Sequence, residues 1–143
     1  KINIFHFIKN IILNYKNHPL ILKKNIKFKL DYNEFKNYNL YINNECYLKI
    51  IFNNIILNSI KYALKNSNIY INIYTEVLDK HKINILIKNK FNIKDLELKD
   101  IFVSSNKLGL DLVERMIKLI NGEWDIRQVN EYFNVEVKIP KNI

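Results

Sequence analysis

Apolar residues recur along this chain with two different periods, and each period predicts a different kind of element. Apolar positions three and four residues apart, which are typical of amphipathic helices, cover residues 2–15, 44–66 and a third stretch ending at Gly122. A shorter helical pattern covers residues 94–102. Alternation of apolar and polar residues, which is typical of strands, marks the other segments. These expected strands are residues 25–32, 38–42, 68–78, 82–89, 123–129 and 132–140.

The polar stretches between these segments predict how the strands are joined. The run DKHK joins two strongly alternating strands, and Asn130 lies between the last two, so each pair is expected to form a hairpin. Helices and strand pairs therefore alternate along the chain. This order predicts an α+β fold: a two-layer α/β sandwich with a mixed, mostly antiparallel sheet and helices on one face.

The chain contains only two glycines, and both flank the last expected helix. Gly122 follows the final apolar position, where glycine commonly ends a helix in the left-handed conformation. Gly109 lies in the first turn, where the missing side chain lets a ligand approach the backbone and where the helix N-terminus attracts anions. Gly122 is therefore expected to be structural, whereas Gly109 is a candidate for ligand contact.

Composition narrows the class of protein. The length of 143 residues suits one domain with a helical lead-in, and no apolar run is long enough to span a bilayer. The net charge of +9 fits an anionic ligand such as a nucleotide. Because the lysines are spread along the chain, a basic nucleic-acid-binding module is the weakest hypothesis, and no nucleic acid is expected as partner. The single cysteine, Cys46, excludes an internal disulfide and is expected to be a buried or half-buried filler.

The longest expected helix carries a polar stripe on an otherwise apolar surface. Asn54, Asn58 and Lys61 are spaced so that they share one side of this helix. Asparagine oxygens are hard ligands that suit Mg²⁺, and a lysine one turn further on can meet a phosphate group. The stripe is either a site for a metal–triphosphate group or a solvated face of an asparagine-rich helix, and the spacing leaves both alternatives open.

Five segments in a fixed order add a family resemblance. They are YLKIIFNNIILNSIKYA, INILIKN, DIF, LGLDLVERMIKLINGEWDI and FNVEVKIP. The series resembles the ATP-binding domain of sensor histidine kinases (the HATPase or GHKL domain, of the Bergerat-type fold), and it extends from about Lys27 to Pro140. The resemblance places residues 23–143 in that domain and residues 1–22 at the end of a dimerisation-type helix and its linker.

The resemblance also implies roles for the polar stripe. Asn58 would be the main Mg²⁺ ligand, and Asn54, one turn earlier, would help to hold the metal or its water. Lys61 would contact phosphate. The implied reaction is transfer of the γ-phosphoryl group of Mg·ATP to a histidine on a separate helical domain, in the service of two-component signalling.

Further roles follow from the same resemblance for the adenine side and the phosphate-facing loop. Tyr62 would line the adenine side, and the side-chain oxygen of Asn89 would accept a hydrogen bond from the adenine amino group. The residues Leu108, Gly109 and Leu110 would form the surviving end of the glycine loop. The implied partners are a nucleotide, the phosphoacceptor domain and a response regulator. The full-length protein would be a cytoplasmic homodimer, or the cytoplasmic part of a membrane sensor.

Two segments depart from the family pattern and motivate an alternative. The Asp-x-Gly-x-Gly motif of the family is replaced by NKFNI, in which Phe91 stands where a glycine is usual, and the lid is reduced to VSSNK. A chain that has lost these glycines and most of its lid fits a second hypothesis. In that hypothesis the domain is a non-catalytic scaffold or phosphotransfer domain that docks a response regulator.

Overall fold

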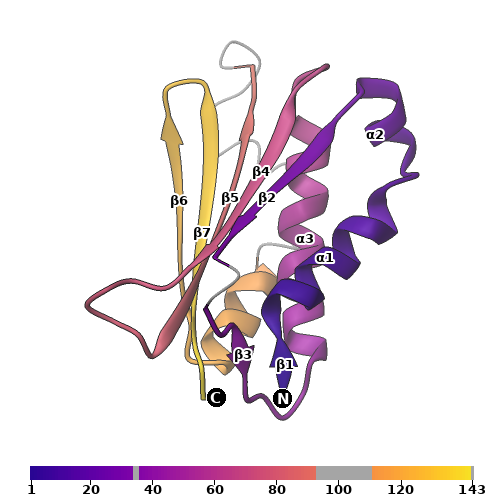
Figure 1. Ribbon diagram of the computed structural model, residues 1–143. Helices are drawn as coiled ribbons and strands as arrows, with labels where there is room; N and C mark the ends of the chain where they lie inside the picture. Colours follow the sequence, from indigo (N-terminus) through magenta and orange to yellow (C-terminus); the bar gives the residue numbers. More distant parts are fainter. Residues whose placement is uncertain (34–35, 93–110, 143) are drawn as a thin grey trace.

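A twisted sheet of five strands forms one layer of the protein, and helices cover one of its faces (Figure 1). The computed structural model describes residues 1–33, 36–92 and 111–142. The β2–β4 pair is parallel, and every other pair in this sheet is antiparallel. The predicted α+β two-layer sandwich is therefore confirmed. The strands follow the order β2 (Lys27–Tyr32), β4 (Asn68–Tyr74), β5 (Lys82–Lys90), β7 (Tyr132–Pro140) and β6 (Glu123–Val129).

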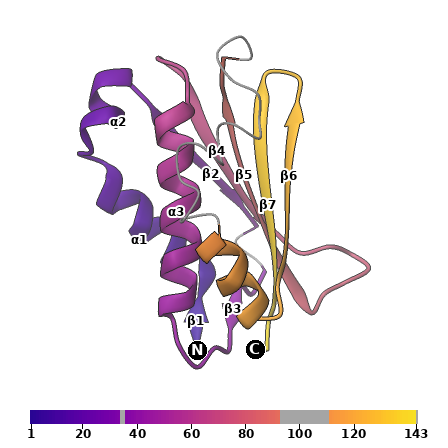
Figure 2. The ribbon, with the colours of Figure 1, turned by 180° about the vertical axis from the view of Figure 1, so that it is seen from behind.

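The helical layer lies on a single face of the sheet. α3 forms the crossover between β2 and β4, which a parallel pair of strands requires. Figure 2 shows the helix over residues 111–119 beside α3 on the same side of the sheet. A small separate sheet pairs β1 (Ile2–Asn3) with β3 (Asn39–Leu40). The labelled helices are α1 (Ile4–Tyr15), α2 (Pro19–Lys24) and α3 (Cys46–Tyr62).

Isoleucines fill the space between the two layers. Alternate residues of β4, β5 and β7 are buried, as expected for strands whose one face is covered by helices, and Asn84 of β5 is buried in addition. Ile4 and Ile8 of α1 and Ile21 of α2 belong to the same buried cluster. The boundary that the sequence predicts after residue 22 thus falls inside α2, between elements that share one core. The division of the chain into two parts stays a prediction.

The sequence pattern does not predict α2, although the signals for its start are present. Pro19 occupies the first helical position, where its missing N–H costs nothing. The Nδ1 atom of His18 accepts a hydrogen bond from the backbone N–H of Leu20 at 3.1 Å and so caps the helix. Asn25 ends α2 in the left-handed conformation. The helix is too short for apolar periodicity to reveal it.

The last helix ends differently from the expectation for Gly122. Asn121 takes the left-handed conformation with a φ of 55°, and Gly122 has no positive φ. The N–H groups of Asn121 and Gly122 donate to the carbonyls of Lys118 and Ile117 in the Schellman pattern. Gly122 is required for another reason: a Cβ atom there would lie 2.9 Å from the carbonyl oxygen of Lys138.

The expectation for Cys46 is also wrong. The residue is exposed, because it is the first residue of α3 and precedes Leu48, the first buried position of the helix. Asn44, just before the helix, accepts a hydrogen bond from the backbone N–H of Cys46 at 3.0 Å. Cys46 therefore belongs to the helix start and not to the core.

Candidate functional site

The candidate site is built on α3, which other elements surround on several sides. β5 contacts one side of the helix, and α1 and α2 contact others. Little of this helix remains exposed. Its almost completely buried apolar side chains include those of Leu48, Ile51, Phe52 and Ile55. A polar side chain on α3 can therefore be drawn into the interior, where water does not satisfy its hydrogen bonds.

Asn58 is such a buried polar residue. Its exposed fraction is 5%, and its Oδ1 atom has no hydrogen-bond partner in the described structure. A buried acceptor without a partner costs about 1–3 kcal/mol, so native proteins keep one mainly where a ligand or function compensates for it. The solvated-face alternative for the polar stripe does not fit Asn58. Two strand residues, Asn84 and Asn134, also have a buried Oδ1 atom without a partner in the described structure, but among the predicted site residues only Asn58 does, and its Oδ1 is the oxygen to which the family resemblance assigns Mg²⁺.

Asn54 and Lys61 lie in different surroundings from Asn58. Asn54 is half-buried, and its Nδ2 atom donates to the carbonyl of Ile50 at 2.7 Å, so its amide nitrogen is held by its own helix. Lys61 is exposed. Along the predicted stripe, the half-buried Asn54 is thus followed by the buried Asn58 and then by the exposed Lys61.

The C-terminal end of α3 is held by a lysine from α2. The Nζ atom of Lys24 donates to the carbonyls of Ile60, Lys61 and Ala63 at 3.2, 2.6 and 3.0 Å. A cation at this position also meets the negative end of the helix dipole. Burial, and next the charge of Lys23, lower the pKa of Lys24. Lys24 thus positions the turn of α3 that carries Lys61 and Tyr62.

No local spacing in the sequence predicts this role of Lys24, because Lys24 and Lys61 lie 37 positions apart.

The two residues predicted for the adenine side lie where α3 meets the sheet. Tyr62 is half-buried and packs against the core. Asn89 on β5 is almost completely buried, with an exposed fraction of 1%, and it shares the helix-facing side of the strand with Ile85 and Ile87. Its Nδ2 atom donates to the carbonyl of Lys90 at 3.1 Å. Asn58 and Asn89 are therefore both buried polar residues between the two layers.

Phe91, which stands in place of a family glycine, belongs to the core. Its exposed fraction is 4%, and its ring meets Phe133 of β7 edge-on, with centroids 5.9 Å apart. The backbone N–H of Phe91 donates to the carbonyl of Glu131 at 3.1 Å. The ring is therefore packed against β7.

The remaining predicted site residues, Leu108, Gly109 and Leu110, lie outside the described residues, as does the expected helix over 94–102. Within the described ranges, no group of three His, Cys, Asp or Glu side chains is arranged to hold a metal ion. A metal at Asn58 would consequently share its coordination with ligand oxygens and water.

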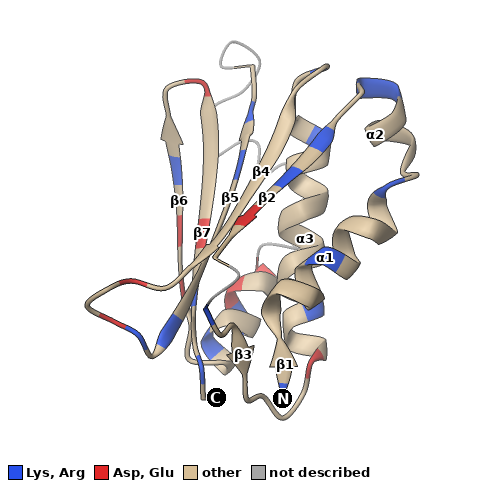
Figure 3. Cartoon of the chain, in the orientation of Figure 1, with Lys and Arg blue, Asp and Glu red and all other residues tan. Residues whose placement is uncertain are grey.

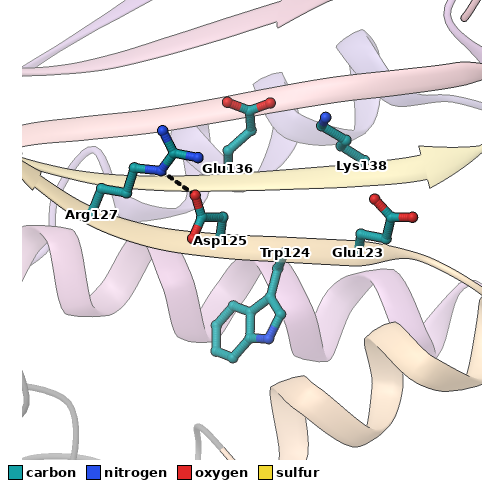
Figure 4. Close-up of a pocket in the computed structure, with 6 residues that line it drawn as sticks. All are labelled: Glu123, Trp124, Asp125, Arg127, Glu136 and Lys138. Carbon is teal, nitrogen blue, oxygen red and sulfur yellow. Dashed lines mark hydrogen bonds and ion pairs between the residues drawn. The ribbon is translucent and has the colours of Figure 1, made fainter.

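A separate cavity of about 320 Å³ is lined by residues of the paired strands β6 and β7 (Figure 4). Its walls carry three carboxylates, from Glu123, Asp125 and Glu136, against two cations, Arg127 and Lys138, and Arg127 is paired with Asp125. Burial, and next the charge of Glu136, raise the pKa of Tyr74 to about 12 on the neighbouring part of this face. Excess negative charge does not suit a polyphosphate. None of the predicted site residues lines this cavity, so it is not the candidate nucleotide site.

No family model and no curated protein sequence matches the chain. Solved structures do match: the nucleotide-free catalytic domain of histidine kinase ThkA has a TM-score of 0.78 and 20% identity, over 99% of this chain and 94% of that one. The histidine kinase AdeS of Acinetobacter baumannii has a TM-score of 0.74 and 14% identity, over 97% of this chain and 66% of that one.

A third match is full-length ShkA, whose structure contains AMPPNP. Its TM-score is 0.76 with 12% identity, and the match covers 97% of this chain but only 30% of ShkA. The two-layer sandwich is therefore of the histidine kinase type. This chain has the fold of the catalytic domains of sensor histidine kinases, so the fold implied by the sequence resemblance is confirmed. In the described part of the chain, no helix has both the length and the apolar character of a membrane span.

Proposed function

We propose that this chain is the ATP-binding catalytic domain of a divergent sensor histidine kinase. It transfers the γ-phosphoryl group of ATP to a histidine on a separate helical domain. The fold of the matched kinase domains supports this proposal. The observation that carries it concerns Asn58, the predicted metal ligand on α3. The Oδ1 atom of this residue is buried and has no hydrogen-bond partner in the described structure.

Mg²⁺ fits this donor set. The ion prefers oxygen ligands and commonly takes only one or two from protein, with phosphate oxygens and water completing its shell. Asn58 would supply the protein oxygen, and Asn54 would hold the ion or its water. Lys61 would contact phosphate from the exposed end of the stripe. When bound, the ion would neutralise negative charge on the phosphates.

The rest of the nucleotide is assigned to the junction of α3 with the sheet. Tyr62 would line the adenine side, and Asn89 would accept a hydrogen bond from the adenine amino group. The loop residues Leu108, Gly109 and Leu110 would face the phosphates. The partners would be a phosphoacceptor domain, a response regulator and a second copy of the kinase, in the cytoplasm.

Binding of a fluorescent ATP analogue tests the proposal. The wild-type domain should bind it in a Mg²⁺-dependent manner, and Asn58→Ala should weaken binding at least about tenfold, since a metal ligand is lost. Asn14→Ala, an exposed asparagine on α1, is the matched control and should bind as the wild type does. Tight binding that Asn58→Ala leaves unaffected contradicts the assigned site.

The second candidate is a non-catalytic scaffold that docks a response regulator. The packing of Phe91 against Phe133, at a place where the family has glycine, favours it. The kinase function and the scaffold function can be distinguished by an experiment on a protein that also includes the phosphoacceptor domain. Incorporation of radioactive phosphate from γ-labelled ATP excludes the scaffold, whereas normal folding without incorporation or nucleotide binding excludes the kinase.

A further inference from the structure

The N-terminal part of the protein has an unusual distribution of charge. Residues 1–30 contain seven lysines and neither Asp nor Glu, within a chain whose net charge is +9. Figure 3 shows that α1 and α2 carry only basic residues among their charged positions, whereas the strands β6 and β7 carry both signs. Although lysines occur along the whole chain, residues 1–30 therefore carry most of its net positive charge. The seven lysines are Lys1, Lys9, Lys16, Lys23, Lys24, Lys27 and Lys29.

A groove of about 500 Å³ opens on this flank, between the C-terminal part of α1, α2 and β2. We call it the α1–α2 groove. Most of its lining is apolar, and two of the apolar side chains, Leu13 and Leu22, are 55% and 65% exposed. Large apolar side chains that remain exposed around a concavity mark an interaction site more often than isolated ones do. The apolar lining consists of Ile12, Leu13, Ile21, Leu22, Ile26 and Phe28.

Three lysines, Lys16, Lys27 and Lys29, line the same groove. All three are exposed, and none of them forms an ion pair in the part of the chain that the structure describes. An apolar surface with lysines that lack acidic partners is complementary to an apolar segment that carries carboxylates.

One wall of the groove is the edge of the main sheet. β2 is the outermost strand in the described sheet and pairs with β4 on its other side. Lys27, Phe28 and Lys29 are consecutive residues of β2, and all three line the groove. Side chains of consecutive strand residues point to opposite faces, so the groove meets the strand edge-on. An edge strand offers backbone groups that an incoming segment can pair with.

We propose that the α1–α2 groove is a docking site for a protein segment in which apolar side chains are flanked by Asp or Glu. The apolar side chains enter the groove between Leu13, Leu22 and Phe28, and the carboxylates meet Lys16, Lys27 and Lys29. A concave surface suits a protein segment better than a flat bilayer, which requires apolar side chains that protrude. The site carries no exposed aromatic ring pair for stacking bases, which disfavours single-stranded nucleic acid.

A displayed library of random peptides, selected against the immobilised domain, tests the chemistry of the occupant. The peptides enriched on the wild type should combine Leu, Ile or Phe with a surplus of Asp and Glu. An enriched peptide, labelled and measured by fluorescence anisotropy, should bind at least about tenfold more weakly to Leu22→Asp and to Lys27→Glu than to the wild type.

Matched controls come from the loop between β4 and β5. Leu78, which is 99% exposed, and the exposed Lys80 lie there, away from the groove. Leu78→Asp and Lys80→Glu should bind the peptide as the wild type does. Circular dichroism melting of every variant separates lost binding from lost folding. Asn58→Ala should leave peptide binding unchanged, so that failure of the nucleotide site and failure of this groove are distinguishable.

Three results overturn the proposal. One is a selection in which the enriched peptides are neutral or basic, or in which no peptide is enriched on the wild type relative to the Leu22→Asp protein. Another is peptide binding that the loop controls weaken as much as the groove variants do. The third is stronger, Leu22-dependent binding to phosphatidylserine vesicles or to single-stranded DNA than to the enriched peptide, because the groove would then serve a membrane or a nucleic acid.

Discussion

α3 and the α1–α2 flank break the usual distribution of polar and apolar residues in opposite directions. α3 buries Asn58 with an oxygen that has no partner, whereas the flank leaves Leu13 and Leu22 largely exposed. Both arrangements destabilise the isolated domain. A buried polar group without a partner gives up its hydrogen bonds to water, and an exposed apolar side chain keeps its surface in contact with water. The comparison indicates two ligand surfaces of different chemistry, one for an oxygen-binding cation and one for an apolar, acidic segment.

The largest expected effect separates the two faces of α1. Ile8 is completely buried, so Ile8→Ala should lower the free energy of unfolding by about 2–4 kcal/mol, because a cavity replaces its side chain. Leu13→Ala, on the exposed side of the same helix, should cost less than about 1 kcal/mol. Urea unfolding of both variants measures the difference. Equal losses would contradict the division of α1 into a core face and a groove face.

The next effect concerns the link between the two regions. Lys24→Met removes the donor that serves three carbonyls at the end of α3, and it should destabilise the fold by about 1–2 kcal/mol. Lys23→Met, at the exposed neighbouring lysine, is the matched control and should change stability by less than about 0.5 kcal/mol. If the two variants unfold at the same urea concentration, the three hydrogen bonds do not hold α2 to α3.

A smaller effect of opposite sign is expected at Asn58. Asn58→Leu replaces the unpaired amide by an apolar group of similar size, which should leave the domain as stable as the wild type or more stable by about 1 kcal/mol. Mg²⁺-dependent nucleotide binding should be lost in the same protein. Thermal melting without ligand, compared with melting at saturating Mg²⁺ and nucleotide, measures both properties. Marked destabilisation without ligand would show that Asn58 is structural.

The smallest effect is expected at Leu22. Leu22→Gln should change the free energy of unfolding by no more than about 0.5 kcal/mol, since the side chain is mostly exposed and contributes little to the core. Thermal melting checks this, with Ile21→Gln as the comparison, because Ile21 is buried one residue away. A large loss at Leu22 would mean that its exposure is only apparent and that the groove is part of the packed interior.

Long periodic segments made much of the fold predictable. The alternation in β4, β5 and β7 and the helical spacing in α1 and α3 each extend over enough residues to exceed local noise. α2 was not predictable in this way because it has only six residues. The sequence does not distinguish Asn121 from Gly122 as the left-handed residue at the helix end, because both residue types tolerate that conformation, and only the backbone shows that Asn121 adopts it.

The candidate site was predictable in its residue types but not in its environment. The spacing of Asn54, Asn58 and Lys61 places them on one stripe, yet spacing does not reveal that Asn58 is buried and Lys61 exposed. That difference depends on which side of α3 meets β5 and α1. The roles of Leu108, Gly109 and Leu110, and of the metal itself, stay predictions.

By itself, the sequence determined the types of the long elements, the layered α+β architecture and the residue chemistry of the polar stripe, because periodicity and spacing are local properties of the chain. Only the tertiary structure decided that Asn58 keeps an unpaired buried oxygen, that Lys24 caps α3 and that Leu13 and Leu22 border a groove beside β2. Each of these features depends on residues far apart in the chain that meet only when the layers pack. Local patterns carry no information about such contacts.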